Sequence, residues 1–357
     1  MTRTVGVEEE YLIVDSDAAA LRPAGERVAA GAERGSDGQF EHELKREQAE
    51  LGSKPHHDLA ELRAELHHRR AELARSAAEQ GARVVAIGTS PVDGASTTTP
   101  EDRYRAMDDI FGDTARSALS CGMHVHVGVA SRAEGVRVLD GVRGWLPVVL
   151  ALSANSPFLD GRDTGHQSYR SMLWQQWPSA GPFGSFADEA DYDATVAALV
   201  ACRAAIDEHG LYFDARLSVQ YPTVEVRVAD VCPWVGDAAA LAGLCRALVD
   251  GCVTGVLPRT SGVYARVELV RAGTWRAARY GLEDTLLHPV SGRLVPAWEL
   301  VDELVETLRP VLEDDLVADS LTAIRRRGTG SRMQRQVYER TGDLAAVLDA
   351  VAVATLA

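Results

Sequence analysis

Several signatures of common enzyme classes are missing from this sequence. It contains no GxxxxGK[ST] loop and no GxGxxG motif after an expected strand. It also lacks a GxSxG elbow, which argues against serine hydrolysis. A nucleotide bound by this chain would therefore be held through metal ions and arginines rather than by a glycine-rich turn.

Positive charge, paired cysteines and long apolar runs are also scarce. The 357 residues include 37 Lys and Arg against 52 Asp and Glu, a net charge of −15, which argues against nucleic-acid binding. Five cysteines without CxxC spacing fit reduced thiols. No run suits a membrane span, and the first expected strand begins too close to Met1 for a signal peptide. We expect a cytoplasmic protein that binds neither nucleic acid nor membrane.

Three short stretches place charged or metal-binding side chains at every second position. GVEEEYLIVD contains Glu8 and Glu10, GMHVHVGV contains His124 and His126, and TVEVRVAD contains Glu225 and Arg227. Because strand side chains alternate between faces, each pair points to one side. The positions between them are mostly apolar: Val7, Tyr11, Ile13, Val125, Val127, Val224, Val226 and Val228. Three such strands in one sheet would have an apolar face for packing and a polar face. We interpret the polar face as an active site that binds metal ions.

Each of these pairs also has a simpler interpretation. The N-terminal carboxylates could form the solvated tip of an edge strand, although stacked like charges repel unless a cation lies between them. Glu225 and Arg227 could be an ion pair with no further role. The HxH spacing is a common way to present two imidazoles to one site, and it favours ligation by at least one of the two histidines.

A fourth acidic stretch, QFEHELKREQAEL at 39–51, mixes strand-like and helix-like signals. If it is helical, Glu43, Glu47 and Glu50 lie at i, i+4 and i+7 on one face. The alternative is a solvated helix face on which Lys45 and Arg46 pair with the carboxylates.

The remaining pattern predicts one α+β domain over residues 1–357, built on a largely antiparallel sheet. Leucines at helical spacing predict a helix over 58–80, with Asp58 as N-cap and Gly81 as its end. Further helices are expected over about 133–152, 188–209 and 237–257, followed by a mostly helical C-terminal third. Aromatic residues in the irregular segment 153–186 (Tyr169, Trp174, Trp177) favour an ordered, functional loop.

Taken in order, these motifs resemble one family. The matching segments are GVEEEYLIVD, EHELKREQAEL, AIGTSP, the RY pair at 103–104, GMHVHVG, the Trp-rich loop ending in GPF, DARLS, TVEVRVAD and ARYGLE. The chain resembles the carboxylate–amine ligases related to glutamate–cysteine ligase type 2, within the glutamine synthetase and guanido kinase superfamily. The resemblance implies a curved antiparallel sheet that holds ATP and divalent cations on its concave face, with helices behind it.

The resemblance also implies roles for individual residues. Two or more Mg²⁺ ions, with Mn²⁺ as an alternative, would be held by Glu8, Glu10, Glu43, Glu50, His124 and Glu225. His126 is secondary to His124 as a ligand. Arg227 would contact phosphate as a catalytic group, and Glu47 would assist. Arg170, Arg216 and Arg279 would hold a substrate carboxylate or phosphate.

The implied reaction is ATP-dependent amide formation through an acyl phosphate, with glutamate and cysteine as the default substrates and γ-glutamylcysteine as the product. A homodimer is expected from the resemblance alone. The chain departs from the family pattern at Ser90, Gln220 and Gly273, which affects the expected substrate rather than the reaction class. Three alternatives remain: a guanidino kinase, a metal-dependent hydrolase or oxygenase that uses the two histidines, and a catalytically silent binding protein.

Overall fold

The computed structural model describes residues 2–34, 39–258, 265–312 and 315–357. Its centre is a seven-stranded sheet with the order β2-β3-β1-β5-β9-β8, in which every pairing is antiparallel. The strands are β1 (Val5–Asp15), β2 (Gln39–His42), β3 (Gln48–Gly52), β4 (Ala82–Val85), β5 (Gly122–Gly128), β8 (Ala215–Leu217) and β9 (Thr223–Asp230). Because β5 pairs with the first half of β1 and β4 with its last residues, β4 continues the same side of β1 beyond β5.

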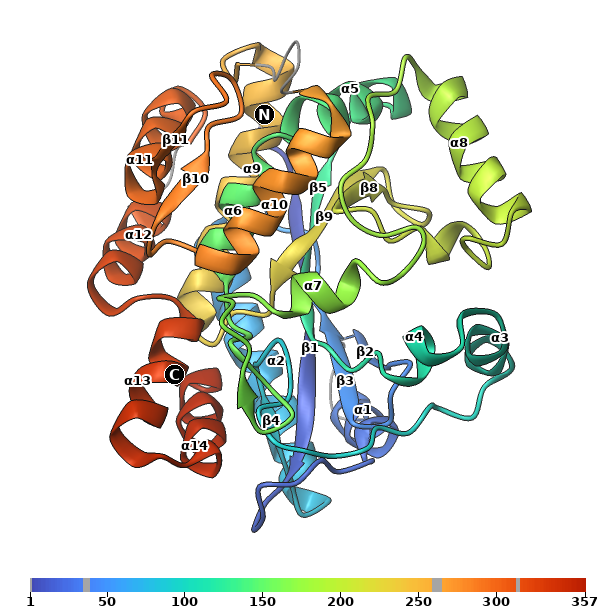
Figure 1. Cartoon of the computed structure of the whole chain (residues 1–357), viewed down its shortest axis with the longest axis vertical. Coiled ribbons are helices and arrows are strands. Elements are labelled where there is room, and N and C mark those ends of the chain that lie inside the picture. The colour runs from blue at the N-terminus through green and yellow to red at the C-terminus, as the bar shows by residue number, and fades with distance from the viewer. Residues whose placement is uncertain (1, 35–38, 259–264, 313–314) are drawn as a thin grey trace.

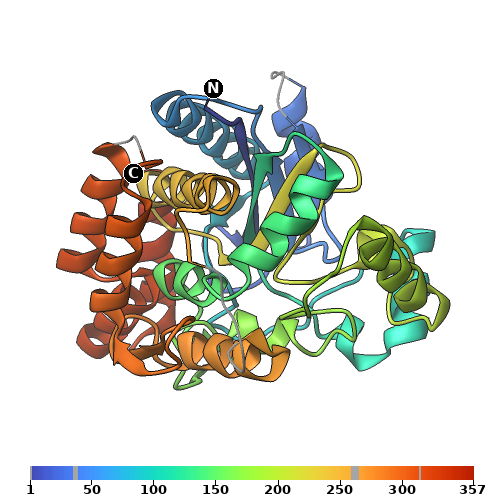
Figure 2. The same ribbon diagram turned by 90° about the horizontal axis from the view of Figure 1, so that it is seen from above.

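One face of this sheet packs against helices. The alternating apolar residues of β1, β5 and β9 are all buried there, as their pattern predicts: Val7, Tyr11, Ile13, Val125, Val127, Val224, Val226 and Val228. The covering helices are α2 (Leu59–Glu79), α5 (Arg132–Val142), α6 (Leu146–Ser153) and α9 (Val235–Thr254). Figure 2 shows α2 and α9 side by side next to the strands. Since α9 is buried along almost its whole length, it forms the centre of the core.

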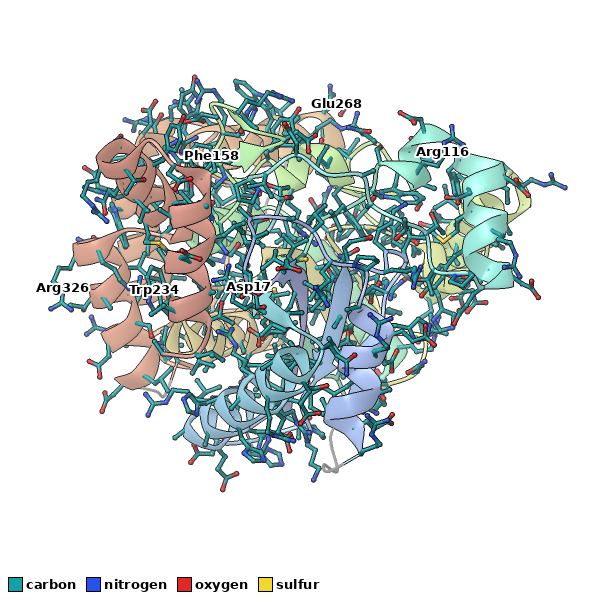
Figure 3. The ribbon with its side chains drawn as sticks, turned by 90° about the horizontal axis from the view of Figure 1, so that it is seen from below. Asp17, Arg116, Phe158, Trp234, Glu268 and Arg326 are labelled. Carbon is teal, nitrogen blue, oxygen red and sulfur yellow. The ribbon has the colours of Figure 1, made fainter. Side chains whose placement is uncertain are left out.

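The C-terminal third adds an outer layer of helices. It contains α10 (Val267–Tyr280), α11 (Ala297–Leu308), α12 (Asp315–Arg327), α13 (Gly330–Thr341), α14 (Leu344–Thr355) and the hairpin β10 (Thr285–Leu287) and β11 (Leu294–Pro296). Helices α11 to α14 lie on the opposite side of the molecule from α3 and α8, and α10 lies between them, against α6 (Figure 1). Arg326 on α12 is exposed and extends outward at the edge of this layer (Figure 3).

Two small lobes lie on the side of the molecule away from α11 to α14 (Figure 1). One contains α3 (Asp102–Phe111) and α4 (Asp113–Arg116), where Arg116 is labelled in Figure 3. The other contains α8 (Glu189–Ala201) and the 3₁₀ turn η1 (Glu208–Gly210). A second apolar cluster, separate from the main core, joins α3 and α4 to α7 (Arg170–Trp174) and to the segment around η1. The short elements α1 (Gly25–Glu33), β6 (Phe158–Leu159) and β7 (Arg162–Asp163) complete the fold.

The α+β class and the large antiparallel sheet are confirmed. The helix expected over 58–80 is Leu59–Glu79, and Asp58 caps it by accepting hydrogen bonds from the backbone N–H groups of Ala60 and Glu61. The helical option for 39–51 is wrong, because this stretch forms the β2–β3 hairpin. The helix expected over 133–152 is divided into α5 and α6, and α8 ends at Ala201 rather than near 209. Among the described residues, no helix is long and apolar enough to cross a membrane.

Candidate functional site

Strand β1 supplies the first two carboxylates of the site. Glu8 and Glu10 line a cavity of about 300 Å³ on the sheet face opposite the helices. Glu9, between them, points to the helix face, where its carboxylate accepts hydrogen bonds from Arg70 of α2. The strict alternation of β1 therefore separates two cavity carboxylates from one that is neutralised within the core.

A group of three carboxylates forms at the β2–β3 hairpin. Oxygens of Glu10, Glu43 and Glu50 all lie within 4.8 Å of one another. Register explains this approach, since Glu10 pairs with Glu50 across β1 and β3, and Glu43 follows the last residue of β2. Burial, reinforced by the neighbouring Glu43 carboxylate, raises the pKa of Glu50 well above its usual range, and burial also raises the pKa of Glu10. A bound cation would relieve this crowding of like charges.

A second group of metal-ligating atoms lies beside the first. Glu8, His126 and Glu225, from β1, β5 and β9, each offer one atom within 4.8 Å of the others. Nε2 of His126 lies 3.2 Å from Oε1 of Glu8. Burial alone would raise the pKa of Glu8, but hydrogen bonds with His124 and His126 hold it well below its usual range. The Glu8 carboxylate is therefore ionised, and the group contains oxygen and nitrogen donors of the kind that divalent cations bind.

His124 lies between the two groups. Its Nδ1 is 3.2 Å from Oε2 of Glu8, and its Nε2 is 3.9 Å from Oε1 of Glu10. That Nε2 is buried and has no hydrogen-bond partner among the described residues. Burial lowers the pKa of His124, so the ring is neutral near pH 7 with a lone pair available on one nitrogen. The preference for His124 over His126 stays a prediction, because His126 is the histidine that completes the compact group.

Two arginines flank the carboxylate of Glu225. Arg216 on β8 donates from Nε to Oε2 of Glu225 at 2.8 Å, and Arg227 on β9 pairs with Oε1. Although burial acts to raise the pKa of Glu225, Arg227 and Arg216 hold it well below its usual range. With two cations on one carboxylate, this part of the cavity keeps a positive charge beside the metal-type ligands.

Part of the cavity lining is aromatic, and the residue-by-residue sequence interpretation gave these side chains no binding or catalytic role. Trp174, Trp177 and Tyr212 line the cavity, with ring centroids 4.9 and 5.2 Å from Tyr212 to the two tryptophans. Arg103 and Tyr104 of α3 complete this part of the lining. The RY pair and the Trp-rich loop were visible as motifs, but neither has an alternating pattern that shows where its side chains point.

Three residues expected at the site lie outside the cavity. Both carboxylate oxygens of Glu47 are bound by Thr97, to its backbone N–H and its hydroxyl, because Glu47 lies in the β2–β3 turn rather than on a helix face shared with Glu43. Arg170 is buried behind Trp174, with its guanidinium 5.4 Å from that ring. Arg279 donates to the carbonyl of Gly165 and lies over Tyr280. Each of the three therefore has another partner in this structure, and their direct contacts with substrate stay predictions.

A second cavity, of about 780 Å³, opens at the other end of the same strands. Glu8 and His126 belong to both cavities, so the second group of ligands lies at their junction. The lining of the larger cavity includes Val7, Val129 and the backbone of Gly52, together with Arg3 and His57 at its border. The two cavities thus differ in character, one acidic and aromatic, the other wider and more apolar.

Comparisons with known proteins agree on one family. The model of glutamate-cysteine ligase family 2 (GCS2) matches residues 4–350. A curated relative from Frankia alni, provisionally named glutamate–cysteine ligase 2-2, is 44% identical over 98% of this chain and 96% of its own length. A relative from Salinispora tropica, provisionally named glutamate–cysteine ligase 2, is 43% identical over 99% of this chain and 95% of its own.

Solved structures share the fold at low sequence identity. The glutamate–cysteine ligase from Francisella tularensis in complex with AMP superposes with a TM-score of 0.68 at 13% identity, covering 100% of this chain and 89% of its own. A bifunctional glutathione synthetase from Pasteurella multocida gives a TM-score of 0.73 at 17% identity, and this chain spans 99% of itself but 52% of that protein. At these identities the likeness concerns the fold alone.

Proposed function

This chain belongs to glutamate-cysteine ligase family 2, and from that premise we propose that its cavity joins the γ-carboxylate of glutamate to the amine of cysteine. The reaction class, ATP-dependent carboxylate–amine ligation, follows from the family. Membership favours this class over the guanidino kinase, the metal-dependent hydrolase or oxygenase and the silent binding protein that the sequence left open. The choice of glutamate and cysteine is our proposal.

One observation carries the proposal: two groups of metal-type ligands and an arginine pair share one cavity. The donor set fits Mg²⁺, since five of the six grouped residues offer carboxylate oxygens. We propose that Glu10, Glu43 and Glu50 hold one ion and that Glu8, His126 and Glu225 hold another. Mg²⁺ bound there would supply charge neutralisation for a triphosphate.

The remaining chemistry is assigned to residues of the chain. A substrate carboxylate attacks the γ-phosphorus of ATP, the bond to the β-phosphate oxygen breaks, and ADP leaves. The amine then attacks the acyl carbon, the bond from that carbon to the phosphate oxygen breaks, and phosphate departs while the nitrogen loses a proton to water. Arg227 faces both anionic partners and stabilises the charge that builds up between them, while Arg216 holds Glu225 in place. No covalent intermediate with a protein side chain is needed, so catalysis rests on positioning and electrostatics.

We assign the nucleoside part of ATP to the larger cavity. Its junction with the acidic cavity lies at Glu8 and His126, so a nucleotide that spans it would bring its terminal phosphate to the ligand groups. The wider and more apolar lining suits a purine. The acidic and aromatic cavity is then left for the amino acids.

The direct test is ADP release from ATP with Mg²⁺ and a panel of amino acids, followed by mass spectrometry of the products. We expect release that depends on both glutamate and cysteine, and a product with the mass of γ-glutamylcysteine. If the product is an amide of another acid or amine, our proposed substrates are wrong and the reaction class still holds. Absence of any ATP turnover with the whole panel would contradict the proposal itself.

We further propose that residues 1–357 act as a single catalytic domain. Use of ATP, together with five cysteines that form no disulfide, favours a cytoplasmic location.

The homodimer stays a prediction, and sedimentation velocity at micromolar concentration tests it.

A further inference from the structure

Arg103 differs from the other arginines that line the acidic cavity. Arg216 and Arg227 are buried and both are ion-paired with Glu225. Arg103, in the first turn of α3, pairs instead with Asp207 at the rim, where the two side chains are 35% and 41% exposed. Of the described arginines that line the cavity, Arg103 is thus the one whose carboxylate partner lies towards solvent.

This rim ion pair is easily exchanged. Partly exposed pairs contribute little to stability because water and salt screen them. Asp207 would also keep a partner on release: its Oδ1 accepts a hydrogen bond from the backbone N–H of Gly210 at 3.0 Å, while Arg103 uses Oδ2. When a substrate carboxylate takes its place at Arg103, the Asp207 carboxylate would therefore keep the hydrogen bond to Oδ1.

The surroundings of Arg103 suit a bound carboxylate. Tyr104 and Tyr212 lie close enough for their pKa values, which burial raises, to be affected by the Arg103 charge. Tyr212 is fixed by both tryptophans, and Met107 and Leu44 pack in the same apolar cluster. A guanidinium can bind a carboxylate through two parallel charge-assisted hydrogen bonds.

The rest of the cavity restricts where an anion can lie. Glu10, Glu43 and Glu50 repel a carboxylate, so an anionic substrate must be held from the arginine side. Glutamate has two carboxylates, and the reacting one belongs beside Arg227 and the ligand groups. The second carboxylate then needs its own cation, and Arg103 is the lining arginine not already paired with Glu225.

We propose that Arg103 binds the non-reacting carboxylate of the glutamate substrate by exchanging Asp207 for it, and so selects a dicarboxylic amino acid. This inference rests on the proposed function. It adds a substrate-specificity residue on α3 and a role for the contact between the two lobes: Asp207 holds the guanidinium in place until substrate arrives.

The test compares Arg103→Met with Arg105→Met, a matched change two residues along α3 at an arginine that pairs with Asp102 outside the cavity. We expect Arg103→Met to raise the KM for glutamate about 10- to 100-fold, the usual effect of losing a charge-assisted hydrogen bond. The KM values for ATP and cysteine should change less than about twofold, and Arg105→Met should leave all three unchanged. Asp207→Asn should leave the KM for glutamate unchanged or lower it up to about fivefold.

A charge exchange separates binding from a purely structural role. In the double variant R103D/D207R the ion pair between the lobes is rebuilt with reversed polarity, so any decrease in Tm caused by Arg103→Met should be recovered. If Arg103 binds substrate, the KM for glutamate stays high. Recovery of both Tm and KM would show that only the ion pair matters, and it would overturn the proposal, as would a rise confined to the KM for cysteine.

Calorimetry with glutamate alone separates failure of this inference from failure of the proposed function. Glutamate binding to the unaltered protein that is lost in Arg103→Met supports the inference, whatever the turnover. Equal binding by both proteins overturns it even if ATP turnover is normal. If the unaltered protein binds no glutamate and turns over no ATP, the proposed function fails first and this inference with it.

Discussion

At the scale of single residues, the site contains buried and closely spaced carboxylates, which destabilise the folded protein. Glu50 is the clearest example, because burial and the neighbouring carboxylates of Glu43, Glu8 and Glu10 raise its pKa well above the usual range. Such crowding lowers stability in the absence of a cation and is typical of residues retained for function.

Glu50→Gln should therefore have opposite effects on stability and activity. Removing one of three crowded carboxylates should raise the free energy of unfolding of the metal-free protein by about 1 kcal/mol at pH 8. ATP turnover should fall by at least about 100-fold, because one ligand group loses a charge. Urea denaturation and ADP release measure the two effects, with Glu26→Gln on the exposed face of α1 as control. Full turnover in a folded Glu50→Gln protein would contradict the assigned role.

Asp214 predicts a pH dependence of stability. Burial raises its pKa from 3.8 to about 7, and its Oδ2 has no hydrogen-bond partner among the described residues. Between about pH 4 and 7 the folded state then keeps a proton that the unfolded state has lost, so this group's contribution to stability falls as pH rises through that window. We expect the unfolding free energy of Asp214→Asn, relative to the unaltered protein, to improve by a few kcal/mol from pH 4 to pH 7.5. A constant difference over that range would disprove the assignment.

At the scale of elements, a residue of α2 fixes the position of β1 from the face of the sheet that packs against the helices. Arg70 of α2 bonds the carboxylate of Glu9 and also the backbone carbonyls of Cys232, Pro233 and Thr355. This buried ion pair fixes the strand whose other face presents Glu8 and Glu10, and it ties the end of α14 to the same point.

Removing one side of that pair should be costly. Arg70→Met leaves the Glu9 carboxylate buried without its cation, for which a loss of about 3–5 kcal/mol is expected. The double variant R70M/E9L removes both charges and should recover much of that loss. Chemical denaturation of the two variants measures the difference. Equal destabilisation by the single and double changes would show that hydrogen bonds to the three carbonyls, rather than the ion pair, matter most.

Local sequence patterns predicted some features of these elements and left others undetermined. Alternation in β1, β5 and β9 predicted both faces of the sheet, because it depends only on strand geometry. The acidic stretch 39–51 was ambiguous, since Glu43 and Glu50 come together equally by helical spacing or across a hairpin. The stretch forms a hairpin rather than a helix because β3 pairs with β1, and no local sequence pattern encodes that contact. For the same reason Glu47 was misplaced: a helix would have put it beside Glu43, whereas a turn directs it to Thr97.

At the scale of the whole molecule, ligands from the strands β1, β5 and β9 and from the β2–β3 hairpin meet in one cavity. Binding of ATP with Mg²⁺ to the folded state alone should therefore stabilise the entire chain by mass action, by about 2.7 kcal/mol at a hundred times the Kd. Thermal unfolding with ATP and Mg²⁺ should show a higher Tm than with either alone, and Glu8→Gln should abolish the increase. An equal increase in the Glu8→Gln protein would place the nucleotide elsewhere.

The sequence by itself determined which side chains share a strand face, because a period of two needs no knowledge of neighbours. It also carried the family's ordered motifs, and with them the reaction class. Only the tertiary structure decided which arginines reach the cavity: Arg103 lines it, whereas Arg170 and Arg279 turn to other partners. These three lie on the helices α3, α7 and α10, and whether a side chain of such a helix reaches the cavity depends on how segments far apart in the chain pack together.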